Sequence, residues 1–209
     1  MKFLIADDHD IVRLGVKLLL QKKYPDAAIT EITDYNSILA KVKNEDHDLL
    51  ILDIHMQETC TIEFIKHLIT LKPAIRIIIL SYLPEDVFAL HYLKAGVMAY
   101  IHKKYDTEVL SRAIDRVLTN RKYLTDAVNA RMLGTDSGDE NLFTRLSERE
   151  IEVLNYMLQG YTSSEICNKM NLHNTTISTY KNRIFEKLHT NNIMELNELA
   201  TIHNLFKKP

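Results

Sequence analysis

The sequence predicts an α/β domain built on a doubly wound, five-stranded parallel sheet, followed by a smaller C-terminal domain of four helices. Short apolar runs alternate with helix-period segments over residues 1–119, no strand-like run follows residue 142, and the most turn-prone stretch, 134–141, lies between. Five strands alternating with five helices are typical of doubly wound folds. We therefore expect an α/β domain at 1–119, a partly helical linker at 120–142 and an all-α domain at 143–209.

Five apolar runs have the length of strands. They cover Lys2–Ala6, 28–33, 48–52, 75–80 and 97–101. The runs at 49–52 and 77–80 are continuous rather than alternating, which is typical of strands buried on both faces of a parallel sheet. Such a chain predicts the strand order 2-1-3-4-5, in which strands 1 and 3 are neighbours and ligands bind beyond their carboxyl ends.

Helix-period apolar residues fill the segments between these strands. In the first helix, apolar or small residues recur at i, i+3, i+4, i+7 and i+8, which predicts one buried face. They are Ile11, Leu14, Gly15, Leu18 and Leu19. Similar patterns occupy 62–69 and 109–118, and the prolines at 73 and 84 mark the end of one helix and the start of another.

Four helices are predicted in the C-terminal domain from apolar periodicity and from cap residues. Ser followed three residues later by Glu predicts a capping box, and Gly predicts a helix end. The second helix spans 162–170 and a tight connection follows it. The expected boundaries are the capping box Ser147–Glu150, a stop at Gly160, a third-helix cap at Asn174 or Thr175 and a fourth-helix cap at Asn192.

Composition excludes several classes of protein. The chain is 46% hydrophobic with a formal net charge of −2, which argues against disorder and against binding nucleic acid by charge alone. Cys60 and Cys167 form no CxxC pair, which excludes a disulfide scaffold and suits a reducing cytosol. Acids follow the first three apolar residues, so we expect no signal peptide. No apolar run approaches the roughly 20 residues of a membrane span, and we expect a cytoplasmic protein.

Polar residues stand where the predicted strands end. Asp7 and Asp8 follow strand 1, Asp53 follows strand 3, Ser81 ends strand 4, and Lys103 lies just past strand 5. Clustered carboxylates repel one another, and Mg²⁺, which prefers oxygen ligands, would relieve that repulsion. One carboxylate could then attack a phosphoryl group, with a hydroxyl and an ammonium stabilising the transferred oxygens. Each residue taken singly could equally be a solvated turn or a helix cap.

Because of these polar residues and the apolar runs before them, residues 1–119 resemble the receiver domain of bacterial two-component response regulators. The resemblance rests on FLIADDH at 3–9, LLILDIHM at 49–56, Ser81 and Lys103. It implies that Asp53 is the phosphoacceptor, and that Asp7, Asp8, Asp53 and the backbone carbonyl of His55 hold Mg²⁺. It implies that Tyr100 is the aromatic switch that turns inward with the Ser81 hydroxyl. From the residues alone, Tyr100 could equally be a core side chain.

One set of residues carries a second family pattern: Leu146, Ser147, Arg149, Glu150, Val153, Leu154, Gly160, Glu165, Ile166, Thr176, Ile177, Ile184, Lys187 and Leu188. On these residues, 146–188 resembles the LuxR-type helix-turn-helix of the NarL/FixJ subfamily, in which a second helix reads DNA. Without the resemblance, a small bundle with a mildly basic face would fit as well. The resemblance implies that Leu196 and Leu199 pair two DNA-binding domains, while their apolar spacing fits core packing equally well and the two roles are compatible. It also implies base contacts by Ser178, Thr179 and Asn182, and mainly phosphate contacts by Lys181, Arg183 and Lys187. The hydroxyls of Thr175 and Thr176, on the outer face of the same helix, are of a type that suits DNA contacts as well.

The resemblance implies a response regulator that is phosphorylated on Asp53 by a sensor histidine kinase, dimerises and binds promoter DNA, with no enzymatic activity beyond its own phosphorylation and dephosphorylation. Gln57, Thr61 and Tyr82 depart from the family pattern. They leave open a regulator that binds DNA without phosphorylation and uses the receiver for docking. A phosphatase or phosphotransferase is a third alternative, although His55 stands where the second acid of a DxD motif would be.

Overall fold

The computed structural model describes residues 1–56, 58–59, 62–134 and 142–203. The chain forms two compact units, Met1–Gly134 and Thr135–Pro209. None of the described helices is long and apolar enough to cross a membrane. The first unit contains all the described strands, and the second contains helices.

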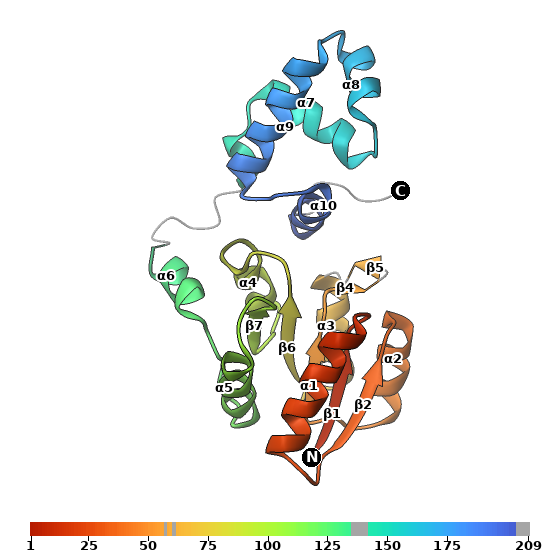
Figure 1. Ribbon diagram of the computed structural model, residues 1–209, viewed down its shortest axis with the longest axis vertical. Coiled ribbons are helices and arrows are strands. Elements are labelled where there is room, and N and C mark those ends of the chain that lie inside the picture. The colour runs from red at the N-terminus through yellow and green to blue at the C-terminus, as the bar shows by residue number, and fades with distance from the viewer. Residues whose placement is uncertain (57, 60–61, 135–141, 204–209) are drawn as a thin grey trace. The chain divides into compact units, whose positions relative to one another are not determined.

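The first unit holds the predicted parallel sheet (Figure 1). Its strands are β1 (Lys2–Ala6), β2 (Ala28–Ile32), β3 (Leu49–Leu52), β6 (Arg76–Ser81) and β7 (Ala99–His102), in the order β2-β1-β3-β6-β7. This order is 2-1-3-4-5 when only these five strands are counted, so the predicted topology is confirmed. Parallel pairing aligns Ala6 with Leu52, which brings the carboxyl ends of β1 and β3 side by side.

Helices cover both faces of this sheet (Figure 1). They are α1 (Asp10–Lys23), α2 (Tyr35–Asn44), α3 (Ile62–Leu71), α4 (Glu85–Lys94) and α5 (Thr107–Leu118). Alternate strand residues such as Phe3, Ile5 and Ile78 pack against buried residues of α1 and α5. Their neighbours in sequence, such as Leu4 and Ile77, are buried as well. Burial on both faces explains why these strands lack a hydrophobic alternation.

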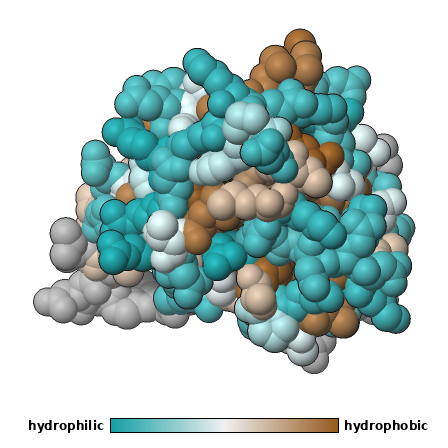
Figure 2. All heavy atoms as spheres, turned by 90° about the horizontal axis from the view of Figure 1, so that it is seen from below, coloured by the Kyte–Doolittle hydropathy of each residue, from teal (hydrophilic) through white to brown (hydrophobic). Residues whose placement is uncertain are grey.

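The first helix forms as predicted, but its buried face is not the predicted one. Val16 and Leu20 are the buried residues of α1, whereas Ile11, Leu14 and Leu18 are exposed. These three residues, here called the α1 stripe, follow helical spacing on the solvent side. In the view from below in Figure 2, hydrophobic areas likewise interrupt a mostly hydrophilic face. An apolar helical stripe therefore predicts the helix without deciding which face enters the core.

The structure adds a hairpin that was not predicted, and it packs the expected helix of the linker on the first unit. A short hairpin joins β4 (His55–Met56) to β5 (Glu58–Thr59) directly after β3. A sixth helix, α6 (Asp126–Gly134), contacts α4, and its Val128 is buried. Part of the segment expected to be linker is thus packed on the first unit, and residues 135–141 of that segment lie outside the described ones.

The second unit begins with a 3₁₀ turn, η1 (Leu142–Arg145). The helices α7 (Glu148–Leu158), α8 (Ser163–Met170), α9 (Asn174–Leu188) and α10 (Ile193–Ile202) follow. The Ser147–Glu150 capping box, the helix end before Gly160 and the Asn192 cap are confirmed. The predicted third-helix cap is wrong: His173 occupies that position and makes no side-chain bond to the first turn of α9.

Candidate functional site

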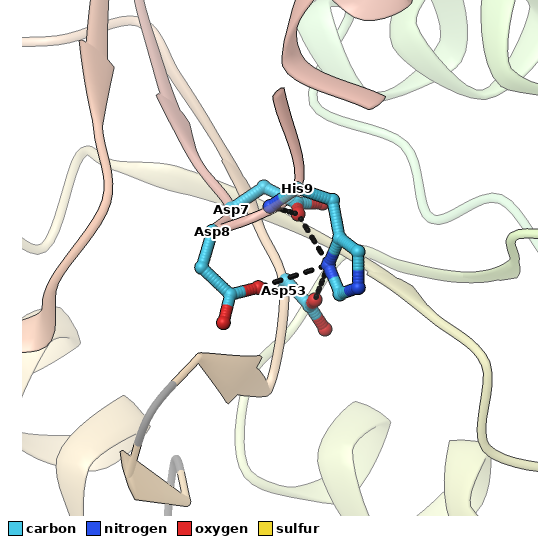
Figure 3. Close-up of side chains that lie close together, drawn as sticks. All are labelled: Asp7, Asp8, His9 and Asp53. Atoms are coloured by element: carbon cyan, nitrogen blue, oxygen red, sulfur yellow. Dashed lines mark hydrogen bonds and ion pairs between the residues drawn. The ribbon is translucent and has the colours of Figure 1, made fainter. Parts of the chain in front are cut away.

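The predicted acidic residues meet at the carboxyl edge of the sheet. Asp7 and Asp53 follow the neighbouring strands β1 and β3, and the main-chain N–H of Asp53 donates to the Ala6 carbonyl over 2.7 Å. One possible ligand atom from each of Asp7, Asp8, His9 and Asp53 lies within 4.8 Å of the others. We call these four residues the acidic cluster; Figure 3 shows them side by side.

Lys103, which follows the edge strand β7, supplies positive charge to the acidic cluster at the same carboxyl end of the sheet. It follows β7, where its main-chain N–H donates to the Ser81 carbonyl over 2.7 Å. Its ammonium lies 2.6 Å from Asp53 Oδ2 and 2.8 Å from Asp7 Oδ2, and all three side chains are at most 3% exposed. Parallel topology thus brings together residues that are about 100 positions apart in the sequence, as expected.

His9 and Tyr35 belong to the site although the sequence did not single them out. The His9 ring lies beside the three carboxylates in Figure 3, and its Nδ1 lies 2.9 Å from Asp8 and 3.3 Å from Asp7. The buried Tyr35 hydroxyl donates to the Asp53 carbonyl over 3.0 Å and so fixes the main chain of that residue. Adjacency to Asp8 could have indicated His9, whereas no local pattern indicates Tyr35.

The donor set fits Mg²⁺. Three carboxylates offer hard oxygen ligands within one small volume, and Mg²⁺ is commonly held by one or two carboxylates while keeping several waters. Asp8 is more exposed than Asp7 and Asp53, so the acidic cluster is accessible from solvent at that side. His55 lies two residues beyond Asp53 at the start of β4. Gln57 and Thr61, which depart from the family pattern, lie outside the described residues.

The side chains of Ser81 and Tyr100 both form hydrogen bonds with the main chain of Leu83, in the loop after β6. The Ser81 Oγ accepts from the Leu83 main-chain N–H over 3.1 Å, and the Tyr100 hydroxyl donates to the Leu83 carbonyl over 3.2 Å. Both side chains are buried. Two residues later, the buried Glu85 accepts from the Thr125 hydroxyl over 2.9 Å, and its bond from the Tyr105 hydroxyl raises the pKa of Tyr105 to about 12. The bonds of Glu85 thus join the start of α4, just after this loop, to Tyr105 and to the segment before α6.

The predicted DNA-contacting residues lie on α9, the second helix of the helix-turn-helix. Asn171 ends α8 in the left-handed conformation, with φ 53°, and α9 begins three residues later. Spacing by three and four places several of the predicted residues along one side of α9. The exposed ones are Thr175, Ser178, Thr179, Asn182 and Arg183, while Thr176, Lys181 and Lys187 are partly buried.

Two of the predicted phosphate contacts have partners inside the unit. Lys187 Nζ lies 2.7 Å from Glu150 Oε2. Lys181 Nζ donates to the Ser163 hydroxyl over 3.1 Å. Burial alone would raise the pKa of Glu150, but hydrogen bonds from Lys187 and Ser147 together hold it below its usual value. Lys187 therefore ties α9 to the start of α7, a role that the sequence did not indicate.

The residues of α10 that the resemblance assigns to pairing lie in the core of the helical unit. Leu196 and Leu199 are completely buried there, as the core-packing interpretation of their spacing predicts, and their role in pairing two copies stays a prediction. Their apolar spacing reflects packing of α10 against α7. The exposed hydrophobic residues of α10 are Ile193 and Met194 at its first turn.

Comparison with known proteins agrees with this two-unit arrangement. Residues 3–115 match the model of the response regulator receiver domain, and residues 144–200 match that of the bacterial regulatory proteins of the luxR family. The chain is 31% identical over 206 residues to a Bordetella pertussis protein named virulence factors putative positive transcription regulator BvgA, covering 98% of both chains. It is 27% identical over 203 residues to the Fimbriae Z protein of Escherichia coli K12, covering 97% of both.

Solved structures show the same likeness over nearly the whole chain. RcsB from Salmonella enterica serovar Typhimurium, bound to a promoter in the presence of the phosphomimetic BeF₃⁻, has a TM-score of 0.68 at 25% identity and covers 98% of this chain and 99% of its own. An RcsB–DNA complex has a TM-score of 0.66 at 25% identity, covering 97% and 98%. The chain belongs to the NarL/FixJ family of two-component response regulators, which join a receiver domain to a LuxR-type DNA-binding domain.

Proposed function

We propose that this regulator is switched by phosphorylation of Asp53, that it receives the phosphoryl group from a sensor histidine kinase, and that the switch controls dimerisation and promoter binding. The observation that carries this proposal is the contact of Lys103 with both Asp53 and Asp7 beside Asp8, because this is an arrangement that offsets charge on a transferred phosphoryl group.

In this chemistry the Asp53 carboxylate attacks phosphorus, the bond to the donor's leaving group breaks, and an acyl phosphate forms on Asp53. The Lys103 ammonium lies close enough to Asp53 to bind the oxygens of the new phosphoryl group. The Tyr35 hydroxyl holds the Asp53 main chain in place. Mg²⁺ held by Asp7, Asp8, Asp53 and the His55 carbonyl would neutralise part of the charge on the transferred group. The chain acts on its own carboxylate, so we propose no separate substrate for it.

The response to phosphorylation would begin at Leu83. A phosphoryl oxygen on Asp53 would accept a hydrogen bond from the Ser81 hydroxyl and draw Ser81 Oγ away from the Leu83 main-chain N–H, from which it now accepts. Tyr100 is bonded to the same residue, so a shift of this loop changes both contacts together. The population shift can be no larger than the differential stabilisation that the phosphoryl group gives to the two conformations.

Two surfaces fit the proposed partners. The α1 stripe is an exposed apolar surface that begins next to the acidic cluster, so a kinase bound there would place its phosphohistidine near Asp53. The exposed side of α9 carries hydroxyl, amide and guanidinium groups, which suit the edges of bases and phosphates in a major groove. A two-fold dimer paired near Ile193 and Met194 would place two such helices about 10 base pairs apart. We propose that such a regulator acts in the cytoplasm, where bacterial promoter DNA lies.

The test is the mass of the intact chain after incubation with acetyl phosphate and Mg²⁺. Wild type is expected to gain one phosphoryl group, and Asp53→Ala none. Asp10→Ala is the matched control, because Asp10 is close in sequence but lies outside the acidic cluster. Equal phosphorylation of Asp53→Ala and wild type would overturn the assignment of the nucleophile.

Phosphorylation-independent DNA binding is the second candidate, favoured by the packing of Tyr82 over Lys103 at 5.0 Å, which narrows access to Asp53. The two candidates differ in DNA affinity. A phosphodonor is expected to strengthen promoter binding by wild type but not by Asp53→Asn. Equal affinities with and without the donor would favour the second candidate.

A further inference from the structure

The proposed phosphoacceptor is closed to solvent. The Asp53 side chain is 2% exposed, and so is that of Lys103, which binds it. An in-line attack needs the donor's phosphorus to approach within contact distance of a carboxylate oxygen. Some group must therefore move before a donor, or later a water molecule, can reach this site.

Two exposed rings lie over the site and touch each other. Tyr82, in the loop after β6, is 59% exposed, and its ring centroid lies 5.0 Å from Lys103 Nζ. The His9 side chain is 54% exposed, and its ring lies beside the three carboxylates, with Nδ1 3.9 Å from Asp53 Oδ2 (Figure 3). The Tyr82 and His9 rings meet edge to face with centroids 6.1 Å apart. Neither residue belongs to a strand, because Tyr82 follows the end of β6 and His9 is the residue before α1.

The ring of Tyr82 also has space into which it can move. A cavity of about 140 Å³ adjoins it, lined as well by Ile11, Tyr105 and Leu110. The ring is held in its present position by the weak contacts with Lys103, His9 and His102, since an exposed cation–π contact or an edge-to-face pair stabilises only slightly. Weak contacts and an adjacent cavity are properties of a movable cover.

We propose that Tyr82, paired with His9, is a lid over the phosphoacceptor that limits both the entry of small phosphodonors and the entry of water. The inference rests on the proposed function of Asp53. In the closed position the ring shields Lys103 and the carboxylate. In hydrolysis, a water oxygen attacks phosphorus, the bond from phosphorus to the Asp53 oxygen breaks, and phosphate and the free carboxylate are released with a proton passing to solvent. Closing the lid therefore lengthens the lifetime of the acyl phosphate.

The experiment measures two rates on the full chain with Mg²⁺: phosphorylation by acetyl phosphate, and loss of the phosphoryl group after the donor is removed. Tyr82→Ala is expected to raise both by about two- to fivefold, the factor by which loss of an exposed cation–π contact shifts an equilibrium. Tyr82→Phe keeps the ring and should keep wild-type rates. The matched control is Tyr161→Ala, which removes a ring 4.6 Å from Lys169 Nζ in the other unit.

A second readout needs neither cation nor phosphodonor. The NMR signals of the His9 ring should shift in Tyr82→Ala, because an aromatic ring is lost at 6.1 Å, and should not shift in Tyr161→Ala. Unchanged His9 signals, or rates in Tyr82→Ala that equal or fall below wild type, would overturn the lid. If wild type gains no phosphoryl group, the proposed function fails, and the His9 signals still decide whether the two rings meet.

Discussion

Both units of this chain contain a buried carboxylate paired with a lysine, but the balance of charge differs. In the receiver, Lys103 lies 2.6 Å from Asp53, with Asp7 and Asp8 beside it. In the helical unit, Lys187 lies 2.7 Å from Glu150, whose other partners are the N–H and hydroxyl of Ser147. Among the described residues, the receiver site holds three carboxylates around one ammonium, whereas the helical site holds one of each.

The difference separates a ligand site from a structural contact. Carboxylates that are brought together repel one another, and burial makes that repulsion stronger than in water. The excess negative charge of the acidic cluster therefore destabilises the receiver until a cation or a cationic group offsets it. Glu150 is satisfied by its own neighbours, so its contacts stabilise the helical unit without any ligand. Buried ion pairs of similar distance thus have different roles.

The largest expected effect comes from breaking the balanced pair. Glu150→Ala removes the capping box and the partner of Lys187, and should lower the free energy of unfolding of the helical unit by about 2 kcal/mol. Urea unfolding of the full chain, followed through NMR signals of α9, measures this loss. Glu152→Ala is the control on the same helix, because Glu152 is more exposed and pairs with Arg149 in the i,i+3 manner. Equal effects of the two variants would contradict the structural role of Glu150.

A smaller effect is expected from acid. The pKa of Glu150 is lowered from 4.5 in the folded chain, so its contribution to stability is complete above about pH 4.5 and is lost as pH falls through the lowered value. Unfolding of α9 by urea should therefore become easier below pH 4.5 in wild type. In Glu150→Gln this part of the pH dependence should be absent. A profile identical to that of wild type would show that another group titrates.

The same comparison explains how much the sequence could predict. The acids of the receiver were predicted because each follows an apolar run, and parallel topology brings strand ends together. The contact between Glu150 and Lys187 joins residues 37 positions apart on two helices, and no local pattern indicates such a partner. For the same reason the apolar spacing in α1 predicted a helix correctly but assigned Ile11 to the core, whereas the structure exposes it.

The most direct test of the excess charge at the receiver site is calorimetric titration of the full chain with Mg²⁺. Wild type should show one saturable site. Asp8→Asn, which removes one of three carboxylates, should weaken binding by about tenfold or more. Asp10→Asn, at a side chain that is 90% exposed and outside the acidic cluster, should bind as wild type does. The absence of saturable binding in wild type, or equal affinities of wild type and Asp8→Asn, would contradict the account.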